Sequence, residues 1–465
     1  MTIRGLLEET AGLAADYLEG LPERPVGWSA SVDALRARLD GPLPDAPVDP
    51  RKVVADLAAA VDPGLVASPS GRYFGFVIGG AVPAALAADW LTSTWDQNSG
   101  LYACGPSAAV AEEVVGAWVA ELLGLPPSAS FALVTGCQMA HVTALAAARH
   151  AVMARVGWDV NERGLIGAPA VNVVVGAERH ATIDRAVRLL GFGTACIVSV
   201  SADGQGRMMP DALREALGRL DGPTILCAQA GNVNTGSVDP LEEIADIAED
   251  TGAWLHIDGA FGLWAAASPA HRQLVAGADR ADSWATDAHK WLSVPYDSGF
   301  AFCAHPEAHR AAMGVRASYL VQSDPDGPRD EVDWTPEFSR RARGFTVYAA
   351  IRSLGRSGVA ELVERCCSHA RRFAAALAES SDIEILNDVV LNQVLVRFLD
   401  PNGDHDARTR SVIQAVQDDG ACWLSGTTWH GMGAMRISVS NWSTTTEDVE
   451  RSIEAILRVA SDART

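Results

Sequence analysis

The chain contains very few primary amines, and this scarcity limits where amine chemistry can take place. Only two of its 37 basic residues are lysines, Lys52 and Lys290, and the other 35 are arginines. Arginine stays charged in proteins, whereas a buried lysine can lose its proton and act as a nucleophile. Lys290 follows His289 in an apolar and aromatic stretch, so burial is expected to favour its neutral amine, unless the side chain only extends from a strand end to solvent. Lys52 begins a predicted amphipathic helix and is expected to be exposed.

A carboxylate and a histidine follow two other apolar runs. Asp258 ends the run 253–257 and precedes the small residues Gly259 and Ala260. Such a carboxylate can pair with a protonated ring nitrogen, and the small residues leave room for a planar group. A cap of a turn or helix is an equally good interpretation of Asp258. His180 follows the run 171–175 and can stack on a planar ring, but a lone histidine there is more often structural.

A glycine turn joins a further apolar run to a helix. In the segment Thr135, Gly136, Cys137 and Gln138, the backbone N–H groups at the helix N-terminus are suited to bind a phosphate. Each of these signals is weak by itself. Together, the candidate phosphate site, histidine, aspartate and lysine come at 136, 180, 258 and 290, each after an apolar run, and this order predicts one composite site.

The elements expected to position these residues are short strands alternating with helices. Apolar runs predict strands at 171–175, 195–200, 224–228, 254–257 and 300–303, and helical spacing predicts helices at 183–190, 211–220 and 241–250. This alternation predicts an α/β fold with a mostly parallel, doubly wound sheet between helices. Ligands in such sheets bind at the carboxyl ends of the strands, which is where the candidate residues fall.

The two ends of the chain have a different texture. Amphipathic helices at 6–18 and 33–39, separated from the sheet by a proline-rich break at 41–47, predict an N-terminal helical arm. After residue 343, a helical stretch, strands within 384–399 and 435–440, and a helix at 448–459 predict a smaller α/β domain. The expected organisation is therefore an arm at 1–70, a large domain at 71–342 and a small C-terminal domain at 343–465.

Composition excludes several classes of protein. The chain has 465 residues, 48% of them hydrophobic, and a formal net charge of −21, which disfavours a nucleic-acid partner. Eight dispersed cysteines without a CxxC pair predict a reducing, cytoplasmic location. No apolar run of membrane-spanning length and no secretory signal is found, so no membrane partner is expected. His305 and His309 have helical spacing but lack the usual zinc-site order and a third ligand, so a solvated helix is expected and no metal is predicted.

Three segments together resemble a known family. His289-Lys-Trp-Leu, Leu255-His-Ile-Asp-Gly-Ala-Phe-Gly and Thr135-Gly-Cys-Gln-Met-Ala are similar to the cofactor motifs of the group II amino acid decarboxylases, which are fold-type I pyridoxal phosphate enzymes. The segment 90–98 looks like the substrate side of the glutamate branch, and the likeness covers roughly residues 70–460. The resemblance implies a seven-stranded-type sheet in the large domain, pyridoxal 5'-phosphate as cofactor, decarboxylation of an L-α-amino acid, and a homodimer with the active site at its interface.

The resemblance also assigns roles to individual residues. It implies that Lys290 forms the internal aldimine, Asp258 holds the pyridine nitrogen and His180 stacks on the ring. The other implied contacts are Ala260 beneath the ring, Gly136, Cys137, Gln138, Asp287 and His289 around the phosphate, and Arg436 with Asn98 on the substrate side. Asp287 stands where well-known members have asparagine, and because an anion near a phosphate would repel it, Asp287 is expected to face a hydroxyl or to be compensated.

One departure from the family leaves the outcome of the reaction open. Family members carry a proton-donating tyrosine on a mobile loop, but the stretch 321–340, which we take as that loop, contains none, and Tyr319 and Tyr348 lie outside it. The breaker-rich segment 324–331 is expected to be the mobile part. Without a donor, oxygen can intercept the carbanion to give an aldehyde, ammonia and peroxide. An aldehyde-lyase reaction and, from a different class, a cofactor-free binding protein are further alternatives.

Overall fold

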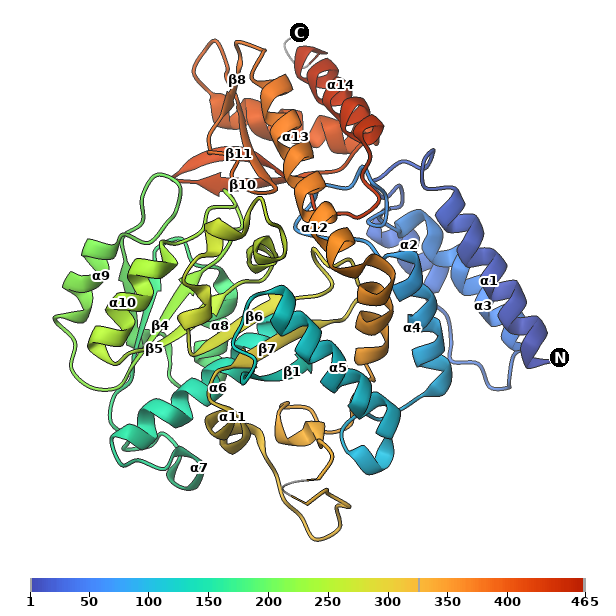
Figure 1. Cartoon of the computed structure of the whole chain (residues 1–465). Helices are drawn as coiled ribbons and strands as arrows, with labels where there is room; N and C mark the ends of the chain where they lie inside the picture. Colours follow the sequence, from blue (N-terminus) through green and yellow to red (C-terminus); the bar gives the residue numbers. More distant parts are fainter. Residues whose placement is uncertain (1, 325–326, 463–465) are drawn as a thin grey trace.

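Short apolar runs form the central sheet in the computed structural model, which describes residues 2–324 and 327–462 (Figure 1). Its strands are β1 (Ser130–Val134), β2 (Asn172–Gly176), β3 (Ile197–Val200), β4 (Thr224–Gln229), β5 (Trp254–Asp258), β6 (Ser283–Asp287) and β7 (Gly299–Cys303), in the order β1-β7-β6-β5-β4-β2-β3. β7 is antiparallel to β1 and β6, and the other pairs are parallel. The predicted mostly parallel sheet is confirmed.

Alternating side chains of the strands build a core on each face of this sheet. Val173 and Val175 pack into a cluster with α6 (Cys137–Arg155) and α8 (Ala181–Leu189), whereas Val174 packs into the larger cluster on the opposite face. The larger cluster includes residues of α5 (Pro106–Leu122), α9 (Pro210–Leu217) and α10 (Leu241–Thr251). A strand points successive side chains to opposite faces, so strands buried on both faces read as continuous apolar runs.

The N-terminal helices lie beside the sheet and not on it (Figure 1). They are α1 (Ile3–Glu19), α2 (Val32–Leu39) and α3 (Pro50–Val61), which pack on one another and bury none of their own residues. α4 (Pro83–Trp95) follows and packs against α12 (Gly344–Leu377). Lys52 is exposed on α3 and pairs with Asp56, as expected. The predicted domain boundaries at 70 and 342 stay predictions.

The C-terminal part forms a second sheet. α12 changes direction at Gly355, whose φ of +64° suits glycine, and leads into the antiparallel order β10-β11-β9-β8. These strands are β8 (Ile383–Ile385), β9 (Gln393–Phe398), β10 (Ser425–Trp429) and β11 (Met432–Ser438). α13 (His405–Asp419) packs on this sheet, and α14 (Thr446–Asp462) packs on α13 and α12. The predicted stretch 384–399 is two strands, and β10 was missed because Ser, Gly and Thr dominate it.

A long irregular segment connects the sheet to α12. α11 (Pro306–Met313) ends before Gly314, and the described part of 314–330 contains no helix or strand. It projects from the body of the molecule (Figure 1). The expected loop at 324–331 falls at its end, although Pro325 and Asp326 lie outside the described residues. The loop therefore begins earlier than the sequence suggested and includes Tyr319, whose residue surface is 82% exposed.

Short elements complete the chain. They are α7 (Val160–Arg163) and the 3₁₀ helices Asp62–Gly64, Tyr102–Cys104, Thr194–Cys196, Gly262–Ala267, Arg272–Val275, Ala278–Arg280 and Glu331–Asp333. Among the described helices, we find none with both the length and the apolar composition needed to cross a bilayer.

Candidate active site

The carboxyl ends of three strands meet at one edge of the central sheet. Asp258 ends β5, Asp287 ends β6, and Gly136 follows β1, which runs in the same direction as β6 because both are antiparallel to β7. Lys290 lies in the turn after β6. Ser298 holds this turn, since its carbonyl oxygen accepts hydrogen bonds from the backbone N–H groups of residues 288 and 289, both at 3.1 Å.

Lys290 is paired with a carboxylate. Its Nζ lies 2.9 Å from Oδ2 of Asp287, whose Oδ1 accepts a hydrogen bond of 2.6 Å from the backbone N–H of Cys137. Burial is the largest single effect and lowers the pKa of Lys290, but the charge and hydrogen bond of Asp287, with Cys137 and Asp258, together outweigh it, so the pKa lies above its ordinary value. The expectation that burial leaves a neutral amine is therefore wrong for this state of the protein. Asp287 is compensated by Lys290 and Cys137, as expected.

The start of α6 approaches this pair very closely. A Cβ atom at Gly136 would lie 2.8 Å from Cε1 of His289 and 3.3 Å from Oδ1 of Asp287, and the φ of Gly136 is +154°. Only glycine fits this approach. His289 accepts a hydrogen bond at Nδ1 from the backbone N–H of Ser298, 3.1 Å away, which leaves Nε2 to face Asp287 at 3.4 Å. The approach brings the N-terminus of α6 against the lysine turn.

Asp258 is a buried but ionised carboxylate. Its Oδ1 accepts a hydrogen bond of 3.2 Å from the backbone N–H of Ala260 and lies 3.5 Å from Nε2 of His141. Burial raises its pKa, but His141, His180 and Lys290 together lower it further, so the pKa lies well below its ordinary value. An ionised carboxylate held at a fixed position can stabilise a cationic ring nitrogen.

His180 and Gln138 are joined through one threonine. His180 caps the N-terminus of α8, and its Nδ1 lies 2.8 Å from the Thr182 hydroxyl, so the structural reading of this histidine is correct in part. Gln138 donates from Nε2 to the Thr182 carbonyl at 3.2 Å. Burial lowers the pKa of His180, which favours a neutral ring. The link holds α8 against the start of α6.

Arg436 reaches the site from the second sheet. It is 8% exposed, and Nη1 donates to the Val233 carbonyl at 3.3 Å. Its buried Nε has no hydrogen-bond partner within the described chain. Burial lowers the pKa of Arg436, and Tyr73 opposes this effect. A buried guanidinium with an unused donor is suited to bind a carboxylate.

Asn98 is not brought to this cluster by any contact among the described residues. Its Oδ1 accepts hydrogen bonds from the backbone N–H groups of Gly100, at 3.0 Å, and Arg340, at 3.2 Å. The amide therefore orders the backbone on both sides, and its predicted substrate contact stays a prediction.

Sequence reasoning missed several neighbours of the lysine turn. The ring of Tyr296 lies over that of His289, with centroids 4.3 Å apart. A Cβ atom at Gly79 would lie 1.7 Å from the carbonyl oxygen of Lys290, so only glycine allows this contact. The adjacent glycines at 79 and 80 were the available signal for a close backbone approach. His141 was missed because it lies inside a helix, where a histidine carries no local signal.

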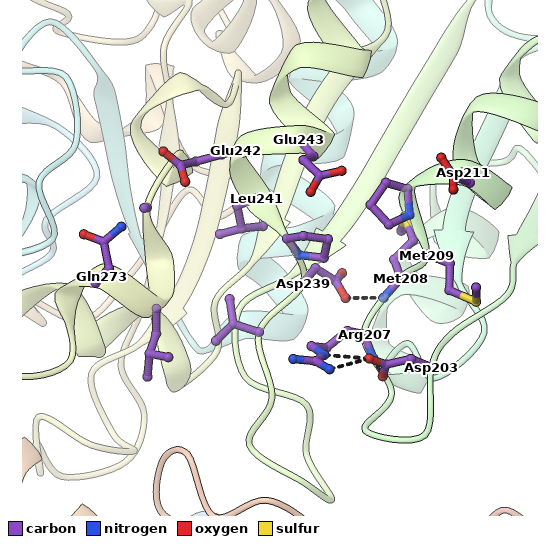
Figure 2. A pocket seen from close by; sticks show the side chains of 15 residues that line it. Asp203, Arg207, Met208, Met209, Asp211, Asp239, Leu241, Glu242, Glu243 and Gln273 are labelled. Carbon is purple, nitrogen blue, oxygen red and sulfur yellow. Dashed lines mark hydrogen bonds and ion pairs between the residues drawn. The ribbon is translucent and has the colours of Figure 1, made fainter.

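A separate cavity of about 520 Å³ lies between the segment 203–211 and the start of α10 (Figure 2). Figure 2 shows carboxylates around it, with Arg207 paired to Asp203 and Asp239 accepting a hydrogen bond from the backbone N–H of Met208. Neither Lys290 nor Asp258 lines it. This cavity is therefore distinct from the cluster around Lys290.

The residues around Lys290 fit a pyridoxal phosphate group. Lys290 offers an amine and Asp258 an anion for a ring nitrogen. The N-terminus of α6 already binds an anionic oxygen, that of Asp287, in a cradle that a side chain at 136 would fill. An α/β fold with these groups at the carboxyl edge of the sheet defines a pyridoxal phosphate enzyme.

The comparisons with known proteins identify the family. Residues 33–399 match the model of the pyridoxal-dependent decarboxylase conserved domain. The chain belongs to the pyridoxal-dependent decarboxylase family. It is 27% identical over 473 residues to the aromatic-L-amino-acid decarboxylase of Bacillus atrophaeus, covering 99% of this chain and 96% of the relative. It is 30% identical to the L-2,4-diaminobutyrate decarboxylase of Rhizobium meliloti (strain 1021), covering 83% and 77%.

One further relative is named for an aldehyde product, and one solved structure shows the fold. The 4-hydroxyphenylacetaldehyde synthase of Rhodiola rosea is 27% identical over 88% of this chain and 85% of that protein. The crystal structure of Oryza sativa TDC with PLP and tryptamine superposes with a TM-score of 0.93 at 23% identity, covering 100% of this chain and 98% of that one. The predicted family, fold class, enzyme class and cofactor are confirmed, and the cofactor-free binding protein is set aside.

Proposed function

We propose that this protein removes the α-carboxylate of an L-amino acid as carbon dioxide, with pyridoxal phosphate held between Lys290 and Asp258. When bound, the cofactor supplies an electron sink for the bonding pair that carbon dioxide leaves behind. The observation that carries the proposal is the pairing of the site's one lysine with Asp287, beside the ionised Asp258. Lys290 would bind the aldehyde of the cofactor, and Asp258 its ring nitrogen.

The remaining predicted residues would orient the substrate and cofactor. The unused Nε donor of buried Arg436 would bind the substrate carboxylate, which fixes the direction of the bond that breaks. Ala260 and His180 would flank the ring, and the backbone of Gly136, Cys137 and Gln138 with His289 would hold the phosphate. Oδ2 of Asp287 lies against the protonated amine of Lys290. Asp287 would therefore control when that amine loses its proton.

We infer that the working enzyme is a homodimer whose active site lies at the interface. Large apolar side chains are exposed on α1, α3 and α4, and they include Leu7, Leu18, Leu57, Trp90 and Trp95. A cavity of about 760 Å³ lies between α1, α4 and the segment 442–451. Exposed apolar surface of this extent is typical of a protein contact. The eight cysteines are all free thiols, which supports a cytoplasmic location.

The test of the main proposal is the substitution Lys290→Ala. We expect the purified variant to lack the visible absorbance band of lysine-bound cofactor and to release no carbon dioxide from any of the common L-amino acids. Lys52→Ala is the matched control, because Lys52 is exposed on α3, and it should retain both properties. A folded Lys290→Ala protein that kept the band would overturn the assignment.

Aldehyde formation is the second candidate outcome, because one relative is an aldehyde synthase. The presence of a proton donor would decide between aldehyde and amine. We propose that Tyr319, carried on the projecting loop, donates the proton and that the product is an amine. Measurement of amine, aldehyde and peroxide under air should show amine for the natural protein. Tyr319→Phe should lower the amine yield at least tenfold, whereas Tyr348→Phe, on α12, should not change it. Aldehyde and peroxide from the natural protein would favour the alternative.

A further inference from the structure

A row of buried side chains extends from Asp258 into the core. His141 Nε2 lies 3.5 Å from Oδ1 of Asp258 and 3.4 Å from Sγ of Cys137, and Nδ1 of the same ring lies 3.0 Å from Nε2 of His256. Nδ1 of His256 lies 2.9 Å from the Ser283 hydroxyl, which accepts a hydrogen bond of 2.9 Å from Nε1 of Trp254. All of these side chains except Asp258 are fully buried, and Asp258 is 5% exposed.

The geometry of the sheet places these groups in a line. Trp254, His256 and Asp258 are alternate residues of β5, so they project from the same face of that strand. Ser283 is the register partner of His256 on β6. His141 enters from α6, which packs across both strands. Three elements therefore supply one continuous row.

The direction of the hydrogen bonds follows from the chemistry of the two ends. Trp254 can only donate, and an ionised Asp258 can only accept. Suppose that every hydrogen points toward Asp258. The Ser283 hydroxyl then donates to His256, and His256 donates from Nε2 to His141. His141 in turn donates from Nε2 to Asp258. Both rings are then neutral, and every donor in the row is satisfied.

The opposite arrangement leaves a buried group without a partner. If His141 carried two protons, it would donate to His256, and His256 would donate to Ser283. The Ser283 hydroxyl hydrogen would then have no acceptor among the described contacts, although Ser283 is fully buried. An unsatisfied buried donor is costly. Burial, the largest effect, lowers the pKa of His256 to about 3, which agrees with a neutral ring.

We infer that Trp254, Ser283, His256 and His141 form a one-directional hydrogen-bond relay that ends on Asp258 and holds this carboxylate ionised and oriented. The inference rests on the proposed function, in which Asp258 meets the ring nitrogen of the cofactor. The contacts that described residues are seen to make to this carboxylate all reach Oδ1, so Oδ2 is left for that nitrogen. His141 and His256 are therefore positioning residues, since they act through Asp258.

Other charged or titratable groups also face Asp258 and belong in any account of its pH dependence. They are Cys137 on α6, Cys227 on β4, Arg179 and His180 before α8, Asp239 after β4, Asp287 at the end of β6 and Lys290 after it. These groups stay in place when the relay is shortened at its far end. A variant of Ser283 therefore tests the relay without changing the local charges around Asp258.

The first test measures the ring nitrogen directly in the holoenzyme. Pyridoxal phosphate labelled with ¹⁵N in its ring is bound to the natural protein, and its nitrogen shift is followed between about pH 5.5 and about pH 8.5. We expect a protonated nitrogen throughout. His141→Phe should move the midpoint of nitrogen titration down by at least about one pH unit and weaken cofactor binding about tenfold. Ser283→Ala should give a smaller shift in the same direction, and Ser283→Thr should restore it.

His150→Phe, on the same helix but without a contact to the row, is the control and should leave the shift unchanged. An unchanged nitrogen shift in folded His141→Phe would overturn the inference. If His141→Phe does not fold, the two Ser283 variants decide the question. Equal nitrogen shifts for Ser283→Ala and Ser283→Thr would also overturn the inference.

The second test needs neither cofactor nor activity. Histidine-labelled apoprotein is examined by long-range ¹H–¹⁵N NMR, with His141→Phe and His256→Phe used for assignment. We expect both rings to be Nε2–H tautomers near neutral pH. A doubly protonated His141, or an Nδ1–H tautomer in either ring, would overturn the relay. Because this result does not depend on decarboxylation, its failure is distinct from the failure of the proposed function.

Discussion

A single carboxylate, Asp287, controls the charge of the candidate nucleophile. It binds the amine of Lys290 at 2.9 Å and the first N–H of α6 at 2.6 Å, so it joins the lysine turn to the candidate phosphate site. An amide at this position would keep the contact to Cys137 but would lack the negative charge. The pair therefore keeps Lys290 protonated until the carboxylate or the amine moves.

The substitution Asp287→Asn should lower the pKa of Lys290, because the opposite charge that raises it is removed while burial remains. We expect the pH midpoint for attachment of pyridoxal phosphate to apoprotein to move down by about one to three units. Stopped-flow absorbance at the band of lysine-bound cofactor gives this midpoint. Asp203→Asn, in the separate cavity of Figure 2, is the control and should keep the natural midpoint. A midpoint that stayed in place would show that Asp287 does not hold the proton.

At the scale of elements, α11 precedes the projecting loop and is tied to strand β1 by His309. His309 on α11 is buried, with Nδ1 2.9 Å from the Ser130 hydroxyl and Nε2 donating to the Trp334 carbonyl at 2.9 Å. The expectation that His305 and His309 lie on a solvated helix is therefore wrong for His309. Asp333 pairs with Arg310 at 2.6 Å and thereby ties the far end of the loop to α11.

The burial of His309 predicts a pH dependence of stability. Its pKa is lowered from the ordinary 6.5 to about 3, first by desolvation, so folding favours the neutral ring. The resulting stabilisation is fully present above pH 6.5 and is lost as the pH falls toward 3. The stability advantage of the natural protein over His309→Gln should therefore shrink by about 1.4 kcal/mol per pH unit below that value. Urea unfolding of both proteins at about pH 7.5 and about pH 5 measures it, and a constant difference would contradict it.

The parts of the fold that the sequence predicts well are those with strong apolar periodicity. The strands at 224–228 and 254–257 were placed within one residue because β4 and β5 are buried on both faces. β10 was missed because its residues are small and polar. The loop was placed too late because only the breaker-rich stretch 324–331 was interpreted as a loop, although Gly314 after α11 is itself a helix-stop signal.

The site could be predicted only where residues follow strands in order. Asp258 and Lys290 each follow an apolar run, so their order in the chain indicates their meeting at one edge of the sheet. His141 contacts Asp258 from within helix α6, and its partner His256 lies inside strand β5. Such contacts depend on the packing of α6 across β5 and carry no sequence spacing of their own. The charge of Lys290 was misjudged for a related reason, because Asp287 opposes burial only once the turn is formed.

At the scale of the whole molecule, the exposed apolar surface of the arm is the contact that the proposed dimer would use. α1, α2 and α3 bury none of their residues in this chain, although Leu7, Leu18 and Leu57 are apolar. Leu18 and Trp90 line one cavity together, with exposed fractions of 38% and 43%. A second copy of the chain that packed on this face would cover surface that water otherwise contacts.

The double substitution Leu18→Glu with Trp90→Glu should therefore separate the dimer, because two charges would be buried at its contact. We expect light scattering after size exclusion to give twice the 49.0 kDa chain mass for the natural protein and a single chain mass for the variant. If the site is completed by the partner, carbon dioxide release should fall at least tenfold while circular dichroism stays unchanged. Ile166→Glu places a charge at an apolar residue that is 97% exposed and distant from the arm in sequence, so it should keep both mass and activity. A fully active monomer of the double variant would place the complete site within one chain.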